Sequence, residues 1–154
     1  MSSSLVFVQE KLFFNVASDS RLLAYDKIIR LTKLDVEPKE FMHEFSMAIE
    51  VINLAQREAE KNNVNTISEI QIEVGDLSGV EAEAFESALG LLVKDTILNN
   101  SKINIIRTPG KGHCNACNLE FEMHHMQASC PHCRAFPSII NGGQEFRVLS
   151  LLVE

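Results

Sequence analysis

The stretch that decides the fold begins with Cys114-Asn115-Ala116-Cys117 and ends with Cys130-Pro131-His132-Cys133. It holds all four cysteines of the chain, as two Cys-x-x-Cys pairs with twelve residues between them. A two-residue gap places two thiolates on one tight turn, and two such turns supply the four corners of a tetrahedral Zn(II) site. The spacing therefore predicts a structural zinc centre with four ligands. They are Cys114, Cys117, Cys130 and Cys133.

Two disulfides, a redox dithiol and an iron centre are alternative interpretations of these cysteines. Disulfides need an oxidising compartment, and the sequence shows no secretory signal ahead of the core, because the apolar start at residues 5–16 is interrupted by Gln9, Glu10 and Lys11. A thioredoxin-like site uses one pair rather than two. Four thiolates also suit an iron centre of the rubredoxin type, so that alternative stays open.

Length and composition indicate one ordinary domain with a small metal-tied module. The chain has 154 residues and a mass of 17.2 kDa, and 45% of its residues are hydrophobic, which is enough for a core. The segment with the cysteines has few large apolar residues, so a metal has to replace a core there. No run approaches the roughly 18 apolar residues of a membrane helix. We expect a soluble protein in the reducing cytoplasm.

The charge of the chain argues against a zinc ribbon that binds nucleic acid. The formal net charge is −7, from 14 Lys and Arg against 21 Asp and Glu. Residues 108–143 hold only Lys111 and Arg134 as fixed positive charges, and Glu120 and Glu122 balance them. Residues 1–41 carry six basic and six acidic side chains, so the whole of the −7 belongs to residues 42–154. Composition thus sets residues 1–41 apart as an N-terminal extension.

Hydrophobic periodicity predicts two helices and a small mixed sheet. Residues 5–8 and 12–16 are typical of short strands, and residues 21–34 have helical spacing, which Pro38 would end. We expect a helix that begins at Ser46 as its N-cap and reaches residues 61–63, and a second from Val80 to Leu98. Strands are expected at residues 67–74, 102–107 and 145–153. The apolar face of the first of these strands should pack on the first helix.

Glycine-rich segments at residues 108–112 and 141–143 enter and leave the stretch with the cysteines. The sequence therefore predicts an α+β (α/β) fold, a small mixed sheet packed with two helices, with an inserted four-cysteine zinc-ribbon-like domain. The α/β domain comprises residues 42–107 plus 144–154, and the zinc domain comprises residues 108–143. The common catalytic motifs are absent, and residues 110–112 lack the Walker A pattern, so we expect no enzyme.

Three separated motifs in this order resemble the HypA/HybF family of hydrogenase-maturation nickel metallochaperones. They are Met42-His-Glu-Phe-Ser46, Ile72-Glu-Val-Gly-Asp-Leu-Ser-Gly-Val-Glu81 and the two cysteine pairs, and residues 142–151 are similar too. The resemblance covers residues 42–154 and implies an α/β nickel-binding domain with an inserted zinc domain. It also implies delivery of Ni(II) to the large subunit of NiFe-hydrogenase, a contribution to urease maturation in some organisms, and a GTPase partner from the same pathway.

The first motif contains donors that suit Ni(II), which favours square-planar or tetragonal sets of nitrogen and oxygen ligands. A chain starting at Met42 offers its terminal amine, a backbone nitrogen, the His43 imidazole and a nearby carboxylate in adjoining chelate rings. We expect His43 as the first nickel ligand, with Glu44 as a second ligand or as the group that orients the imidazole. Glu81 matches the acidic position of the family and is a further candidate. Without the other motifs, a His-Glu pair here equally fits an exposed helix start, with Glu44 complementing the helix dipole.

The family motif normally opens the mature protein, whereas 41 residues precede it here. With these residues present, Met42 has a peptide nitrogen and no free amine, so the anchor of the chelate is lost. One hypothesis is a start of translation at Met42, because codons for Lys39-Glu40 can resemble a ribosome-binding site. The other hypothesis is an extension that folds over the α/β domain.

The remaining histidines lie in or beside the stretch with the cysteines. They are His113, His124, His125 and His132. One interpretation is that they are surface residues beside a tetrahedron that four thiolates already close. The other is a cluster whose protonation alters the zinc module, and with it the affinity for nickel.

An alternative function is a zinc-ribbon adaptor that scaffolds protein contacts and holds no second metal. A nickel titration separates the adaptor from the metallochaperone. We expect neither nucleic acid nor membrane among the partners. The sequence leaves open the client enzyme, the oligomeric state and the affinity for nickel.

Overall fold

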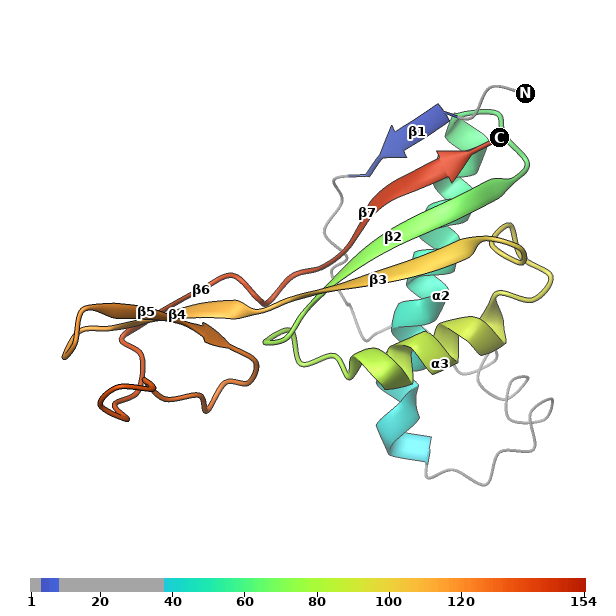
Figure 1. The fold of residues 1–154 in the computed structure, drawn as a ribbon. Helices are drawn as coiled ribbons and strands as arrows, with labels where there is room; N and C mark the ends of the chain where they lie inside the picture. Colours follow the sequence, from blue (N-terminus) through green and yellow to red (C-terminus); the bar gives the residue numbers. More distant parts are fainter. Residues whose placement is uncertain (1–3, 9–37) are drawn as a thin grey trace.

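The computed structural model describes residues 4–8 and 38–154, the latter with side chains from residue 43 onward. Two helices and seven strands follow one another along these residues (Figure 1). They are β1 (Ser4–Phe7), α2 (Pro38–Lys61), β2 (Ile67–Gly75), α3 (Ala82–Leu92), β3 (Lys102–Thr108), β4 (Gly110–Cys114), β5 (Leu119–Met123), β6 (Ile139–Asn141) and β7 (Phe146–Val153).

The larger sheet has four strands in the order β1-β7-β2-β3. Strand β7 is antiparallel to both β1 and β2, whereas β2 and β3 are parallel and α3 lies on the connection between them. Ile70, Ile72 and Val74 of β2 are buried, and the polar residues between them are half-buried. This alternation is typical of a strand with one face on a core. The predicted mixed sheet is confirmed.

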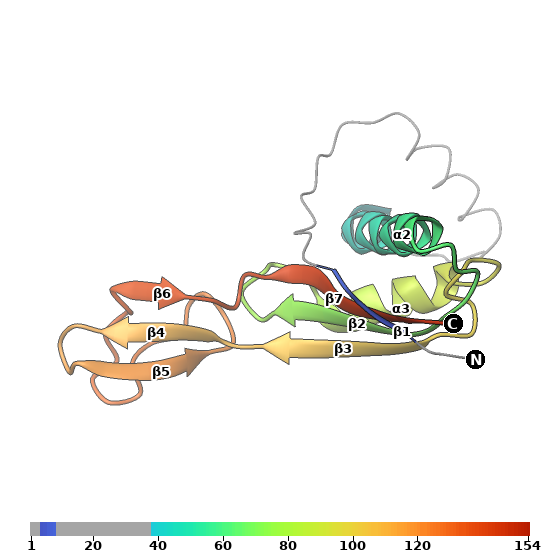
Figure 2. The same cartoon turned by 90° about the horizontal axis from the view of Figure 1, so that it is seen from above.

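Both helices cover the same face of this sheet (Figures 1 and 2). Helix α2 buries Met47, Val51 and Leu54, which recur at spacings of four and three and therefore share one side of the helix. Phe85 of α3 meets Phe146 of β7 edge to face, with ring centroids 5.1 Å apart at 89°. Aromatic pairs in this geometry add about 0.5–1.5 kcal/mol beyond their buried area. The core therefore ties α3 directly to the sheet.

Two predicted helix boundaries are wrong. Helix α2 begins at Pro38 and not at the predicted N-cap Ser46. Proline suits the first helical turn, where its missing N–H costs nothing. Helix α3 begins after Glu81 and ends at Leu92, six residues before the predicted end. Val93 is the C-cap, and Asp95, which follows in the chain, adopts a left-handed φ of 62°.

Part of the N-terminal extension belongs to the sheet. The strand predicted at residues 5–8 is present as β1 at residues 4–7, which pairs antiparallel with β7, from Ser4 opposite Val153 to Phe7 opposite Ser150. Val8 is buried in the same core. The second predicted strand of the extension, residues 12–16, and the helical pattern at residues 21–34 lie outside the described residues.

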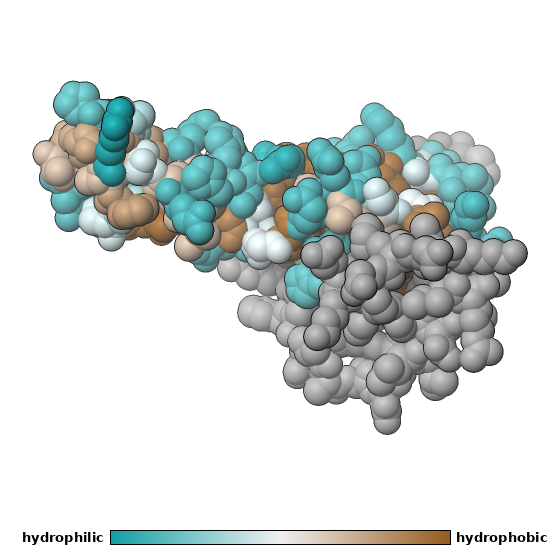
Figure 3. All heavy atoms as spheres, turned by 90° about the horizontal axis from the view of Figure 1, so that it is seen from below, coloured by the Kyte–Doolittle hydropathy of each residue, from teal (hydrophilic) through white to brown (hydrophobic). Residues whose placement is uncertain are grey.

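The smaller sheet has three strands in the order β5-β4-β6, and we call residues 110–141 the arm. The arm projects beyond the larger sheet, with β4 nearly in line with β3 (Figure 2). In the space-filling view this narrow end shows apolar and polar residues intermixed on its surface (Figure 3). Neither helix of the described residues has the length and apolarity of a membrane span. The predicted α+β architecture with a separate small sheet around the cysteines is confirmed.

Candidate metal centre

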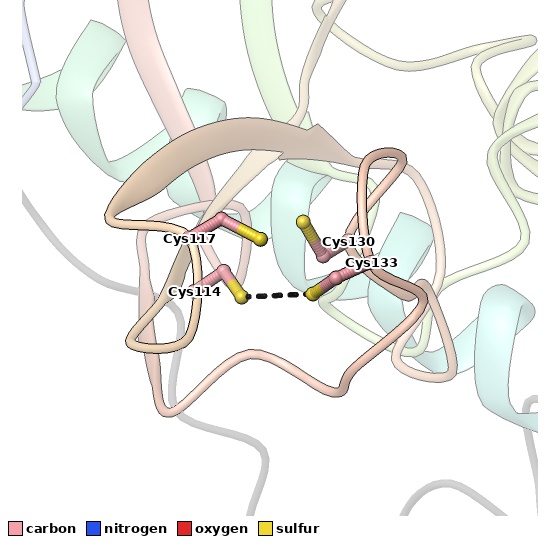
Figure 4. Close-up of side chains that lie close together, drawn as sticks. All are labelled: Cys114, Cys117, Cys130 and Cys133. Carbon is pink, nitrogen blue, oxygen red and sulfur yellow. Dashed lines mark hydrogen bonds between the residues drawn. The ribbon is translucent and has the colours of Figure 1, made fainter.

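The four cysteines of the arm converge on one point (Figure 4). Their sulfur atoms all lie within 4.8 Å of one another, and the Cys114 and Cys133 sulfurs are 3.5 Å apart. A tetrahedral Zn(II) with Zn–S bonds of about 2.3 Å requires sulfurs about 3.8 Å apart. All four are free thiols, and Cys114 and Cys130 are buried. The donor set and its spacing therefore fit Zn(II).

Each cysteine pair sits on a turn that the local sequence shapes. Cys114 ends β4, and the turn after it closes at Asn118, whose φ is 53°. The second turn closes at Arg134, with φ of 63°, and the Arg134 N–H donates to the Cys130 carbonyl at 2.8 Å. The Cys130 N–H in turn donates to the Ala135 carbonyl at 2.8 Å. These turns fold both pairs toward a common centre.

The closeness of the four sulfurs shifts the pKa values of two of these thiols in opposite directions. A hydrogen bond from the Ala135 backbone, supported by the Cys117 thiol, lowers the pKa of Cys133 to about 7. The neighbouring Cys133 sulfur, followed by desolvation, raises the pKa of Cys117 to about 12. One thiol of the set therefore ionises readily, and its negative charge opposes ionisation of the next. A bound dication removes that opposition and permits four thiolates.

The arm has little apolar core of its own. Its buried residues are Gly110, Gly112, Cys114, Met123 and Cys130. A Cβ on Gly112 would press on the side chains of Met123 and Phe121, at 2.8 and 2.9 Å, so β4 and β5 pack closely there. Burying one methionine contributes about 1.5–3 kcal/mol, whereas structural zinc contributes about 10–16 kcal/mol in small modules. A metal at the cysteines is therefore the dominant source of order in the arm.

The two predicted nickel ligands lie together in the second turn of α2. The His43 side chain is 53% exposed, and its Nδ1 is 3.9 Å from Oε1 of Glu44. Glu44 is 6% exposed, and its Oε2 is buried without a hydrogen-bond partner. Among the described residues Glu145 Oε2 shares that condition, but only Glu44 has an imidazole within ion-pair distance. Glu44 thus places a carboxylate oxygen that can ligate a metal beside a histidine.

Glu81 lies elsewhere in the fold. It is exposed at the N-cap of α3, and its Oε1 accepts a hydrogen bond from the Glu83 N–H at 3.3 Å. Within the described residues the four cysteines are the one group of three or more metal-type side chains that come together. The structure therefore pairs His43 with Glu44 and does not bring Glu81 to them.

The four histidines near the cysteines point to different neighbours. His132 Nδ1 is 3.3 Å from the Cys117 sulfur, and His124 Nδ1 is 2.6 Å from Oδ2 of Asp76. His113 is half-buried in β4, and His125 is exposed. They do not form one cluster in the described structure.

In the sequence, Asp76 stands out only as a member of the motif at residues 72–81. In the structure both of its carboxylate oxygens are used, because Arg107 Nη2 is 2.9 Å from Oδ1 while His124 binds Oδ2. Residue spacing gives no signal for this contact, since its partners are 31 and 48 residues away.

The comparisons with known proteins match the same residues. The family described as "Hydrogenase/urease nickel incorporation, metallochaperone, hypA" matches residues 42–153. The chain belongs to the HypA family. The hydrogenase maturation factor HypA of Francisella philomiragia is 37% identical over 111 residues, which cover 72% of this chain and 98% of that protein. The HypA of Parabacteroides distasonis is 33% identical over 113 residues, which cover 73% of this chain and 98% of that protein.

A solved structure of a HypA protein is also similar to this chain. The solution structure of the Ni metallochaperone HypA from Helicobacter pylori is 24% identical, with a TM-score of 0.49, over 71% of this chain and 96% of that chain. Membership in the HypA family confirms the predicted nickel metallochaperone with a four-cysteine zinc site, and a metallochaperone carries out no catalysis of its own.

Proposed function

We propose that this HypA-family chain binds Ni(II) through His43 and Glu44 and passes it to the maturation of NiFe-hydrogenase or urease. The observation that carries the proposal is the buried Glu44 carboxylate, whose Oε2 has no hydrogen-bond partner while His43 lies 3.9 Å from Oε1. A buried carboxylate oxygen without a partner costs free energy, and a cation shared with an imidazole offsets that cost. Imidazole and carboxylate are also donors that Ni(II) accepts.

Glu81 enters the proposal as a later ligand. Its carboxylate caps α3 by accepting the Glu83 N–H. Coordination of nickel by Glu81 would have to replace that hydrogen bond or use the second oxygen. We therefore assign capture of nickel to His43 and Glu44, and completion of the coordination to Glu81.

Residues 1–41 set the strength of nickel binding in this proposal. Met42 lies within α2, and the 41 residues before it make its nitrogen a peptide nitrogen in the full chain. A chain that begins at Met42 adds a terminal amine and a backbone nitrogen to the imidazole. We expect the shorter chain to bind nickel more tightly, because adjoining chelate rings hold the ion at less entropic cost.

The zinc centre has a structural role in this proposal, with Cys114, Cys117, Cys130 and Cys133 as its four ligands. Free thiols in this arrangement fit the reducing cytoplasm. The family description supports clients in hydrogenase and urease maturation. A GTPase of the maturation pathway and the large subunit of hydrogenase are the partners we propose.

Calorimetric titration with Ni(II) tests the proposal. The full chain and a chain beginning at Met42 are compared, both loaded with zinc, each as parent, His43→Ala and Glu44→Gln. His125→Ala is the matched control, because His125 is exposed and distant in sequence from the proposed ligands. We expect one tight nickel site in the shorter chain, lost in His43→Ala and weakened in Glu44→Gln. Absence of nickel binding in both parents would favour the adaptor function instead.

A further inference from the structure

The junction between the two sheets is formed by a few backbone segments. The chain crosses it at Pro109, between β3 and β4, and at residues 142–145, between β6 and β7. The loop after β2 contacts both crossings. The Leu77 N–H donates to the Gly143 carbonyl at 2.6 Å, and a Cβ on Gly110 would overlap the Leu77 side chain. The loop after β2 thus packs against the segments that connect the arm to the larger sheet.

Asp76, in this loop, is the one side chain among the described residues that forms ion pairs with both the larger sheet and the arm. Its side chain is only 5% exposed. Arg107 of β3 binds Oδ1, with Nη2 at 2.9 Å and Nε at 3.0 Å, while His124 of the arm binds Oδ2 at 2.6 Å. Over residues 4–8 and 38–154, the His124–Asp76 contact is the only side-chain ion pair between the arm and the rest of the chain.

An exposed ion pair of this kind would contribute little, because water screens it and both side chains lose freedom. The Asp76 pair differs in that its carboxylate is buried and both oxygens are used. Arg107 holds the carboxylate in place from within the larger sheet, so His124 meets an acceptor that is already oriented. A preoriented acceptor makes the contact directional, so it adds a side-chain restraint to the backbone hydrogen bonds at the two crossings.

We propose that Asp76 is a positioning residue that clamps the arm by binding His124 and so fixes the direction of the zinc centre relative to the loop that carries Glu81. When His124 is released, only the backbone contacts at the two crossings hold the direction of the arm, and the positive-φ glycines Gly142 and Gly143 lie at one of them. The proposal goes beyond the proposed function, because it requires no nickel at His43.

Charge makes the clamp sensitive to pH. The hydrogen bond from His124, followed by that from Arg107, lowers the pKa of Asp76 against the effect of desolvation. The carboxylate therefore stays charged through the neutral range. The clamp should open only when Asp76 itself is protonated, below its ordinary pKa of 3.8.

Residual dipolar couplings of backbone amides test the clamp in the full, zinc-loaded chain. The parent should need one alignment tensor for β2, β3, β7 and the arm strands at neutral pH. His124→Ala and Asp76→Asn should need separate tensors for the arm and the larger sheet. His125→Ala is the control, since the neighbouring His125 forms no ion pair in the described structure and should behave as the parent.

His124 is 64% exposed, so its removal should leave the fold and the zinc content intact, which zinc analysis and amide shift dispersion verify. A single tensor in both His124→Ala and Asp76→Asn would overturn the proposal. Separate tensors in the parent at neutral pH would overturn it as well.

Discussion

A single methyl group at residue 143 tests the packing of the junction. Gly142 and Gly143 are neighbours with similar positive φ values of 65° and 74°. A Cβ on Gly143 would overlap the backbone of Gly110, with the Gly110 Cα at 2.6 Å, and would lie 3.0 Å from the Pro109 carbonyl carbon. A Cβ on Gly142 would meet only Glu145 Oε1, at an ordinary 3.8 Å. Gly142→Ala is therefore the matched control for Gly143→Ala.

The two substitutions share every cost except the overlap. An alanine in the left-handed region costs about 1–2 kcal/mol, and the loss of freedom in the unfolded chain returns about 0.4–1 kcal/mol in both variants. Overlap with backbone atoms, which cannot move aside as a flexible side chain does, adds about 1–3 kcal/mol. We expect Gly142→Ala to lose about 1 kcal/mol of unfolding free energy and Gly143→Ala about 2–4 kcal/mol.

Urea unfolding at fixed free zinc measures the difference. Far-UV circular dichroism is the suitable signal, because the chain contains no tryptophan. With urea m-values of about 1–3 kcal/mol per molar, the midpoints of the two variants should differ by roughly 1 M. Equal midpoints would show that the connection between β6 and β7 does not press on Gly110, and the close junction would be refuted.

Three further predictions follow from the arm, the sheet edge and the clamp. Chelation of zinc should collapse the amide signals of residues 110–141 and leave those of β2 and β7 dispersed, because the arm buries little besides its cysteines and Met123; dispersed arm signals in zinc-free protein would contradict this. Removal of residues 1–41 should expose the edge of β7 that β1 now covers and produce concentration-dependent self-association in light scattering, unlike the full chain; a monomer at all concentrations would show that the edge needs no cover. The pKa of Asp76 is lowered from 3.8, first by His124, so its contribution to stability is complete well above pH 3.8 and is lost as the pH falls through the lowered value. The difference in unfolding midpoint between parent and Asp76→Asn should therefore be constant from neutral pH down to about 5 and shrink below it. A difference that grows on acidification would reverse the assigned sign.

The sequence was most informative where the spacing of residues within a short segment determines the local structure. The alternation around Ile70, Ile72 and Val74 predicted β2, and the pair spacing of the cysteines predicted the arm, because both are set within a few residues. Helix boundaries were harder. Leu98 is fully buried although α3 ends at Leu92, so apolar spacing continued past the helix and suggested a longer one.

Contacts between distant residues left no pattern to find. Asp76 and His124 are ordinary residues of a turn and of a loop, and only the fold brings their side chains to 2.6 Å. The start of α2 was misplaced for a different reason. Ser46 fits an N-cap, but a proline is also favoured in the first turn of a helix, and α2 begins at Pro38.

The continuity of α2 sets a condition on the nickel site. Neighbouring residues of a helix project about 100° apart, so His43 and Glu44 alone hold one ion only at the edge of their reach, as their separation of 3.9 Å reflects. A chelate that also uses backbone nitrogens of residues 42 and 43 cannot coexist with helical hydrogen bonds from those nitrogens. Tight binding of nickel in this way therefore requires unwinding of the first turns of α2 together with a free amine at Met42. The full chain satisfies neither requirement in the described conformation, so the proposed chelate predicts weaker nickel binding by the full chain than by a chain that begins at Met42.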